Sequence, residues 1–298
     1  MRVAISGASG LIGTALRKEL AARGYECVSL VRRPALPGEV EWNPAGHLEP
    51  GSLSGCDAVV HLSGKDIAGR WTERFKREAY DSRVESTRTL AGAAAESFRQ
   101  SRRPKVFLSA SAIGYYGDRG DELLTESSPP GKTGFSPKLV LAWEAAAAPA
   151  SEAGLRVANL RFGVVLAAQG GALKKMLSAF RLGLGGRIGN GQQYLSWVSL
   201  DDVVGTILLT LRNDNLGGAL NIVAPNPVRN AEFTETLGHL LGRPTLLPVP
   251  AFLVWLLLGQ MGDELLLASQ RVEPSKLKAA GYQFRHAELR EALTAVLT

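Results

Sequence analysis

The stretch ISGASGLIG, residues 5–13, begins almost at the first residue and places three glycines in the spacing G-x-x-G-x-x-G. The apolar run before it, residues 2–6, predicts a short buried strand. Residues 11–23 carry apolar side chains at helical spacing and end before Gly24, which favours a helix. The glycines therefore lie in the turn between a first strand and a first helix.

A glycine-rich turn in this position is typical of a dinucleotide site. Gly7 permits the tight turn, Gly10 lets the backbone approach a pyrophosphate, and Gly13 allows the helix to pack closely. The free N–H groups and the positive dipole end of the helix favour the phosphates. A glycine-rich turn without a ligand is the alternative interpretation. The residues predicted to hold the cofactor in this turn are Gly7, Ser9, Gly10, Leu11, Ile12 and Gly13.

The end of the second predicted strand, residues 26–31, indicates which dinucleotide is preferred. An acidic residue there would bind the 2′-hydroxyl of the adenosine ribose. This chain instead has Arg32 and Arg33, whose planar guanidinium groups match phosphate oxygens. Unless both are solvated surface charges, they favour a 2′-phosphate, so the sequence predicts NADP(H).

Strand and helix patterns alternate along the first two thirds of the chain. This alternation predicts an α/β fold with a doubly wound parallel sheet of the Rossmann type. The apolar stripes of the predicted helices could pack internally or form a homodimer. Further strands are expected at residues 58–62, 106–109 and 156–161, and further helices at residues 74–96 and 142–153.

The pattern changes after residue 165. A glycine-rich segment, residues 170–191, is expected to be a flexible insertion on the ligand side. The rest of the chain is mostly helical and interrupted by prolines. We therefore predict an NADP-binding domain at residues 1–167, to whose sheet residues 196–222 return, and a smaller, mostly helical substrate-side lobe at residues 168–298.

Composition narrows the classes of function. Two cysteines without CxxC spacing and four scattered histidines predict no disulfide framework and no metal site. The net charge of +6 is spread along the chain, which disfavours nucleic acid and fits an anionic small ligand. The apolar run at residues 246–259 is interrupted by prolines and shorter than the roughly 20 residues that span a bilayer. We expect a buried helix there, no membrane partner and, without a signal-peptide pattern, a cytoplasmic protein.

Three motifs together resemble the extended short-chain dehydrogenase/reductase superfamily: the glycine turn, DAVVHLSG at residues 57–64 and SASAIGYYG at residues 109–117. Further stretches, among them WNP, LRFGVVL, GQQYLSWVSLDD and RVEPSKLKAAGYQF, are similar to one atypical branch. Its members are called epimerase family proteins or, loosely, cell-division-inhibitor-like proteins. They carry a small C-terminal domain of unknown role, and the likeness extends over essentially the whole chain.

The resemblance implies further site residues. In the superfamily the loop after the third strand lines the cofactor, and Ser111 matches the serine that polarises the substrate. Packing for His61 and strand-end hydrogen bonding for the serines are the alternatives. The cofactor neighbours implied in this way are Asp57, near the adenine, His61, Leu62, Ser63, Gly64 and Ser109.

The acid/base pair of the superfamily is missing from the sequence. Its members use a tyrosine followed four residues later by a lysine, whereas this chain contains no Y-x-x-x-K. Phe135 and Leu139 stand at the corresponding positions, and phenylalanine cannot transfer a proton. The candidates for substitute catalysis are Ser111, Tyr115 and Tyr116, although each tyrosine could equally be a packing residue.

Two functions remain open from the sequence. The favoured one is an NADP(H)-dependent epimerase or reductase acting on a small carbonyl or sugar-nucleotide-like substrate without the usual pair. The alternative is a non-catalytic NADP(H)-binding regulator or scaffold. A polar or anionic substrate would meet residues on the lobe side, with Trp197 as ordinary core the competing interpretation. The expected substrate neighbours are Phe135, Arg161, Arg187, Gln193, Ser196 and Trp197.

Overall fold

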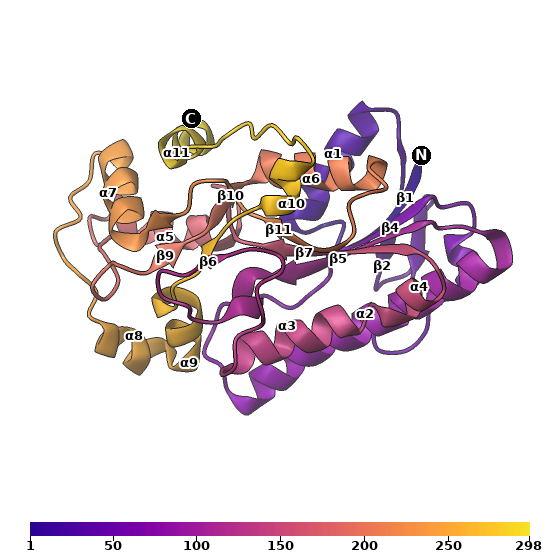
Figure 1. Cartoon of the computed structure of the whole chain (residues 1–298), viewed down its shortest axis with the longest axis horizontal. Helices are drawn as coiled ribbons and strands as arrows, with labels where there is room; N and C mark the ends of the chain where they lie inside the picture. Colours follow the sequence, from indigo (N-terminus) through magenta and orange to yellow (C-terminus); the bar gives the residue numbers. More distant parts are fainter.

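A seven-stranded parallel sheet forms the centre of the protein (Figure 1). The computed structural model describes residues 1–298 except for the side chain of Pro50. All neighbouring strands run parallel, in the order β11-β7-β5-β4-β1-β2-β3. The chain thus winds outward from β1 in both directions, and the predicted doubly wound sheet is confirmed. The strands are β1 Arg2–Ser6, β2 Glu26–Val31, β3 Glu39–Glu41, β4 Ala58–His61, β5 Val106–Ala112, β7 Arg156–Phe162 and β11 Gly218–Ile222.

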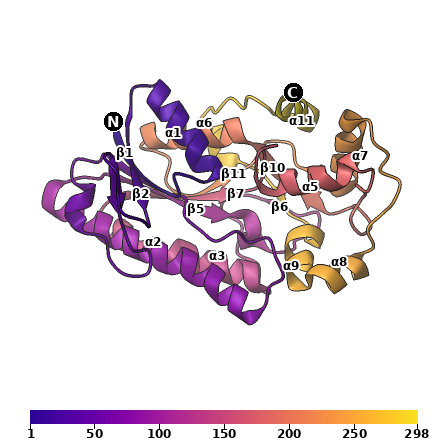
Figure 2. The same cartoon turned by 180° about the vertical axis from the view of Figure 1, so that it is seen from behind.

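Helices cover both faces of the sheet, as a parallel sheet requires (Figures 1 and 2). Side chains of β1 alternate between the two resulting cores: Val3 and Ile5 pack with one, and Ala4 packs with the other. The first core lies under α1 and α6, and the second lies under α2 and α4. The helices that flank the sheet are α1 Leu11–Ala22, α6 Leu200–Arg212, α2 Glu73–Ser101, α3 Phe135–Ala145 and α4 Ala148–Glu152.

A smaller, mostly helical lobe lies at one end of the sheet (Figures 1 and 2). Its core contains Leu173, Trp197, Phe233 and Leu293. Short strand pairs, β8 with β10, β9 with β12 and β6 with β13, connect its loops. The remaining elements are η1 Pro50–Leu53, η2 Ile113–Tyr116, β6 Leu123–Leu124, β8 Val164–Leu166, α5 Gly171–Arg181, β9 Tyr194–Leu195, β10 Trp197–Ser199, β12 Val228–Arg229, α7 Asn230–Leu241, α8 Ala251–Leu258, α9 Gln260–Gly262, the π-helical turn η3 Asp263–Leu267, β13 Arg271–Val272, α10 Ser275–Ala279 and α11 Leu289–Leu297.

The helix predicted at residues 142–153 is wrong in its bounds. The structure has α3 up to Ala145 and then the separate short helix α4. Pro149 lies in the first turn of α4, where its missing N–H costs nothing, and it could not continue α3. At its other end α3 begins directly after Gly134, whose φ of +100° separates it from the preceding loop.

The prediction of a buried helix within residues 246–259 is also wrong. The helix α8 forms, but Val254 is its one buried residue. Phe252, Trp255 and Leu257 are each at least 60% exposed, because apolar side chains surround the whole helix and the lobe covers one side. Among the described residues, no helix is long and apolar enough to cross a membrane.

Two helical glycines with opposite surroundings give a test of this packing. A Cβ on Gly13 in α1 would lie 2.2 Å from the carbonyl oxygen of Gly7, whereas a Cβ on Gly92 in α2 would meet open space. We expect Gly13→Ala to lower the free energy of unfolding by about 1–3 kcal/mol through overpacking. Gly92→Ala should raise it by about 0.5–1 kcal/mol, the helix-propensity gain. Urea unfolding of both variants measures this, and equal effects would contradict the close approach at Gly13.

Candidate functional site

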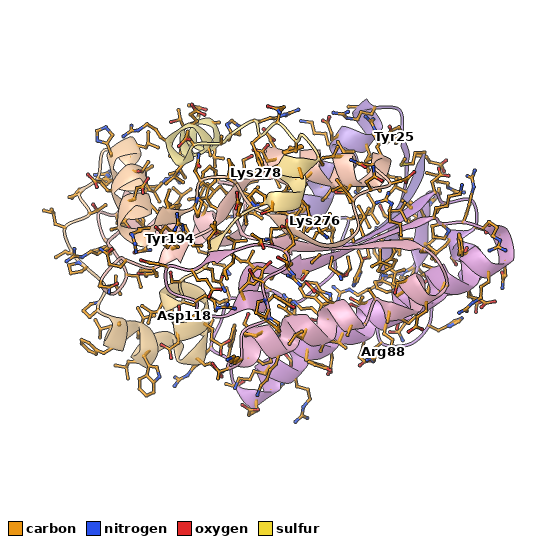
Figure 3. The ribbon with its side chains drawn as sticks, viewed as in Figure 1. Tyr25, Arg88, Asp118, Tyr194, Lys276 and Lys278 are labelled. Carbon is orange, nitrogen blue, oxygen red and sulfur yellow. The ribbon has the colours of Figure 1, made fainter. Side chains whose placement is uncertain are left out.

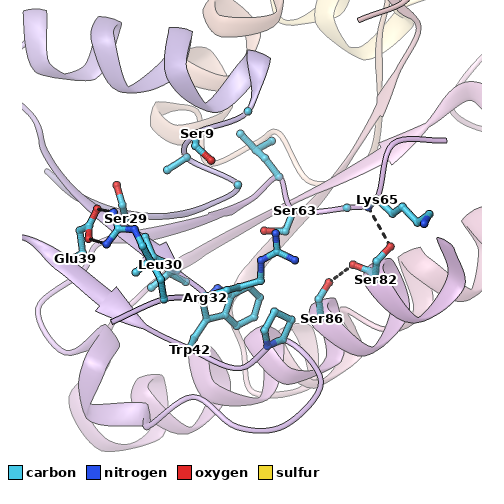
Figure 4. A pocket seen from close by; sticks show the side chains of 18 of the residues that line it. Ser9, Ser29, Leu30, Arg32, Glu39, Trp42, Ser63, Lys65, Ser82 and Ser86 are labelled. Atoms are coloured by element: carbon cyan, nitrogen blue, oxygen red, sulfur yellow. Dashed lines mark hydrogen bonds and ion pairs between the residues drawn. The ribbon is translucent and has the colours of Figure 1, made fainter. Parts of the chain in front are cut away.

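A large cavity opens at the carboxyl ends of β1, β2 and β4 (Figure 4). Its volume is about 1130 Å³, and ligands of doubly wound sheets bind at such an edge. The glycine turn, the end of β2, the loop after β4 and one side of α2 build its walls. The predicted cofactor residues that line it are Gly7, Ser9, Gly10, Arg32, Arg33, Leu62, Ser63 and Gly64.

The glycine turn presents backbone rather than side chains to the cavity. Gly7 has a φ of +72°, and a Cβ on it would lie 2.7 Å from the backbone carbon of Leu62. Gly10 is the N-cap of α1 and supplies no side-chain hydrogen bond to the first helical turn. That turn, formed by Leu11, Ile12 and Gly13, therefore leaves N–H groups for an anionic ligand.

The two predicted phosphate-binding arginines have different surroundings. The guanidinium of Arg33 forms a two-pronged pair with Glu39, at 2.7 Å and 2.8 Å. Arg32 is exposed, and Figure 4 shows it reaching across the cavity toward Ser63. Within the described residues no hydrogen bond or ion pair engages the Arg32 side chain. Arg32 is thus the better placed of the two to meet an added anion.

One wall of the cavity comes from α2 and was not anticipated from the sequence. Ser82 and Ser86 line it, and Ser82 Oγ accepts the Lys65 N–H at 3.1 Å. Lys65 pairs with Glu78 of the same helix at 2.6 Å, which ties the loop after β4 to α2. The signal available was the spacing of the two serines, four residues apart and hence on one helix face.

The structure corrects the positions of two implied cofactor neighbours. Asp57 precedes β4 at the amino end of the strand, where it accepts the Arg2 N–H at 2.8 Å and pairs with Arg103 at 2.7 Å. That edge is opposite the cavity. His61 is fully buried between Ser6 and Ser86, with ring nitrogens 2.5 Å and 3.1 Å from their hydroxyl oxygens, and does not line the cavity.

A buried polar network lies between β5, α3 and β7. Ser111 donates to Glu144 Oε1 at 2.6 Å, and Arg161 donates to both carboxylate oxygens of Glu144, at 2.7 Å and 2.8 Å. Burial lowers the pKa of Arg161, but the hydrogen bonds and charge interactions with Glu144 and Tyr116 together outweigh burial, so the net pKa is raised. Ser109 is fully buried beside this network and contacts the carbonyl of Ala110. Neither serine lines the large cavity.

Tyr116 lies in the interior in this structure, and its action on a substrate stays a prediction. Its side chain is fully buried, and its hydroxyl lies 2.7 Å from Asn221 Oδ1 and accepts from Arg161 at 3.0 Å. Burial raises the pKa of Tyr116, the opposite of what an acid/base tyrosine needs. Tyr115 is half-buried, with the Arg161 guanidinium 3.4 Å from its ring centroid.

The start of α3, where the acid/base pair would stand, is apolar on its inner side. Phe135 packs edge-on against Trp71, with ring centroids 5.1 Å apart, and Leu139 is buried in the cluster around Trp143. The carboxylate of Glu264, from the lobe, accepts the N–H groups of Phe135 and Ser136 at 2.8 Å and 2.7 Å. Sequence analysis missed Glu264, because 129 residues separate it from Phe135.

Three of the expected substrate neighbours, Arg161, Ser196 and Trp197, are buried in the protein interior. Arg161 is 3% exposed and paired as described, and Trp197 is fully buried with its N–H donated to the Asn226 carbonyl. Ser196 bridges to the lobe by donating to the Gln270 carbonyl and accepting the Val272 N–H. In this arrangement the polar groups of the three side chains have protein partners, and a contact with a substrate stays a prediction.

A second cavity, of about 800 Å³, lies where the loop after η2 meets the lobe. Gln193 lines it, but its amide donates to the carbonyls of Ile188 and Leu266. Asp118, labelled in Figure 3, lines it from the opposite loop. Arg187 is exposed and does not line this cavity.

Comparisons with known proteins agree with this architecture. The family model described as "NAD dependent epimerase/dehydratase family" matches residues 3–223, and "Domain of unknown function (DUF1731)" matches residues 249–296. The chain belongs to the epimerase family. An epimerase family protein of Mycobacterium leprae is 43% identical over 299 residues, covering 99% of this chain and 95% of that protein.

Solved structures of epimerase family members share the fold. The crystal structure of the human epimerase family protein SDR39U1, isoform 2, with NADPH has a TM-score of 0.90 at 39% identity, covering 99% of both chains. A nucleoside-diphosphate sugar epimerase from Corynebacterium glutamicum has a TM-score of 0.83 at 36% identity, covering all of this chain and 58% of that one. The epimerase family proteins thus include both an NADPH complex and a chain named for sugar-nucleotide chemistry.

The buried His61 predicts a measurable pH dependence. Burial lowers its pKa from 6.5 to about 3, so the folded protein keeps the ring neutral while the unfolded chain binds a proton. Stability from this group is present above the unfolded pKa and is lost as the pH falls. Between pH of about 6.5 and about 4.5 the free energy of unfolding should fall about 2 kcal/mol more in the wild-type protein than in His61→Gln. Denaturant titrations across this range test it, with the exposed His47→Gln as control; equal slopes in all three proteins would contradict it.

Proposed function

We propose that the chain binds NADPH in the large cavity and uses it to reduce or epimerise a small carbonyl or sugar-nucleotide-like substrate. The observation that carries the proposal is Arg32, an exposed guanidinium at the end of β2 with no partner among the described residues. The glycine turn, the N-terminus of α1 and Arg32 lie along one cavity. These groups bind phosphate, which NADPH carries in its pyrophosphate and at its 2′ position. The human relative solved with NADPH supports the same cofactor.

The residues present fit this cofactor. Because Gly7 has no side chain, its backbone can lie against that of Leu62, and both residues line the cavity. The N–H groups of the turn would hold the pyrophosphate, Arg32 the 2′-phosphate, and Ser63 and Gly64 would line the ribose side. NADPH supplies a hydride when it is bound.

Ser111 and the start of α3 would form the chemical end of the site. Since the Ser111 hydroxyl donates to Glu144, its oxygen is left as an acceptor and suits a substrate hydroxyl. Arg161 holds Glu144 in place through two hydrogen bonds, which makes it a positioning residue. Phe135 and Leu139 would exclude water without transferring a proton.

A second candidate is a non-catalytic NADP(H)-binding regulator. It is favoured by the hydroxyls of Ser111 and Tyr116, because both are committed to protein partners. It is also favoured by the apolar residues at the usual acid/base positions. The two candidate functions share the cofactor NADP(H), but only the enzyme would convert a substrate.

Cofactor preference tests the binding part of the proposal. We expect Arg32→Ala to weaken NADPH binding about 10- to 100-fold, the effect of about 1.5–3 kcal/mol for a hydrogen bond to a charged group. NADH affinity should be unchanged, because it lacks the 2′-phosphate. Arg33→Ala is the matched control and should lose less, since Glu39 already occupies Arg33. Calorimetric titration measures all four affinities, and equal NADPH and NADH affinity in the wild-type protein would rule out the assignment.

Ser111 tests the catalytic part. In single-turnover assays of NADPH oxidation with ketones, enones and nucleotide sugars, Ser111→Ala should slow hydride transfer about 10-fold, the effect of about 1.5 kcal/mol for one lost hydrogen bond to the substrate. NADPH affinity should stay the same. Ser109→Ala, a buried serine that contacts a backbone carbonyl alone, should leave both unchanged. If no substrate in the screen is turned over while NADPH binds tightly, the regulator replaces the enzyme.

A further inference from the structure

The lobe carries a concentrated apolar surface. Eight large apolar side chains on two neighbouring segments are 58–86% exposed. Elsewhere the exposed large apolar residues are single and scattered, such as Leu36 and Leu141. We call these eight residues the lobe apolar face: Leu182, Leu184, Leu246, Leu247, Phe252, Trp255, Leu256 and Leu257.

The two segments are adjacent in space. Val249 donates its N–H to the Arg187 carbonyl at 2.8 Å, and Gly189 donates back to the Val249 carbonyl at 2.8 Å. Gly186 lies directly against the Leu247 carbonyl, so the loop after α5 runs beside the entry to α8. In both views α8 lies at the outer edge of the lobe with no other element over it (Figures 1 and 2). The two segments are therefore neighbours, and α8 is open at the edge of the lobe.

The charges on these segments all have one sign. Residues 242–262 contain one charged residue, Arg243, and residues 153–200 contain no Asp or Glu. Arg181, Arg187 and Arg243 are exposed and lie within five residues of members of the face. The nearest acidic residues are Asp263, which follows α9, and Asp118 and Asp121, which line the second cavity beside Ala251. The charged residues closest in sequence to the members of the face are the three arginines. An apolar patch flanked by arginines is complementary to a surface that is apolar inside and anionic outside.

We propose that the lobe apolar face docks this protein on the surface of an anionic lipid bilayer. Trp255, Phe252 and the leucines would enter the boundary between headgroups and acyl chains, and the arginines would meet lipid phosphates. With eight residues, α8 is about 12 Å long and lies in the interface without crossing it. A second copy is a poorer occupant, because a two-fold contact would bring Arg181, Arg187 and Arg243 of both copies to one interface, where like charges repel.

This inference revises an expectation from the sequence. The sequence predicts no membrane partner, since its apolar run reads as a buried helix. The exposure of α8 removes that reason. The inference does not depend on NADPH or on turnover, since the face and the large cavity share no residue.

Vesicle co-sedimentation of the full-length protein tests the proposal. The protein should bind vesicles of mixed phosphatidylcholine and phosphatidylglycerol, bind pure phosphatidylcholine vesicles weakly, and be released by salt. The double variant Trp255→Ser, Leu256→Ser should lose binding. Arg181→Glu with Arg187→Glu should weaken it about tenfold or more, since each basic residue near an anionic surface contributes about 1 kcal/mol.

The matched control is Leu36→Ser with Leu141→Ser, which removes exposed apolar side chains outside the face and should bind like the wild-type protein. Circular dichroism of each variant confirms that it is folded. No binding to mixed vesicles, or equal binding to both vesicle types, overturns the proposal. A lipid-free dimer that Trp255→Ser dissociates, seen by analytical ultracentrifugation without vesicle binding, overturns it in favour of a second copy.

Discussion

The close approach of α1 to the turn that follows β1 is the constraint on which the cofactor cavity depends. A side chain at Gly13 would strike the Gly7 carbonyl, and one at Gly7 would strike the backbone of Leu62. The strand register adds the second condition, because Ser6 is paired with Leu30 on one side and with His61 on the other. Two residues beyond these partners, Arg32 and Ser63 emerge at the same edge. The glycines allow α1 to begin close to the turn, and the strand register places Arg32 and Ser63 near the start of that helix.

The buried pair of Arg161 and Glu144 has a comparable role at the other end of the site. It joins β7 to α3, and through Ser111 and Tyr116 it reaches β5 and η2. Removing one partner of a buried ion pair leaves an uncompensated charge and costs about 3–5 kcal/mol, whereas the intact pair adds little net stability. The pair therefore fixes geometry. It occupies the hydroxyls that sequence reasoning had assigned to chemistry.

The sequence was sufficient where local patterns decide structure. Alternating apolar runs and the glycine turn predicted the sheet and the cavity edge, because both follow from neighbours along the chain. It failed where a distant partner decides. The roles of Tyr116 and Ser196 depend on Asn221 and Gln270, 105 and 74 residues away. Asp57 was misplaced because a strand motif does not state at which end of the strand its first residue lies. The exposure of α8 could not be predicted from the sequence, because a helix that is apolar on all sides has no polar face to indicate which side meets solvent.

The lobe is joined to the start of α3 by one carboxylate. Glu264 accepts two N–H groups at the helix N-terminus, where an anion is favoured by the helix dipole, and Gln260 donates to its Oε1 at 2.6 Å. Glu264 also belongs to the unit that carries α8, since a Cβ on Gly262 would lie 2.6 Å from Val254 Cγ1. Helix α8 thus packs against the segment that carries Glu264, and Glu264 in turn binds the backbone of Phe135. Moving the lobe away would leave the N–H groups of Phe135 and Ser136 without that carboxylate, at a cost of about 1.5–3 kcal/mol for each hydrogen bond to a charged group that water replaces. The position of the lobe and the position of the apolar wall at the chemical end of the site are therefore set together.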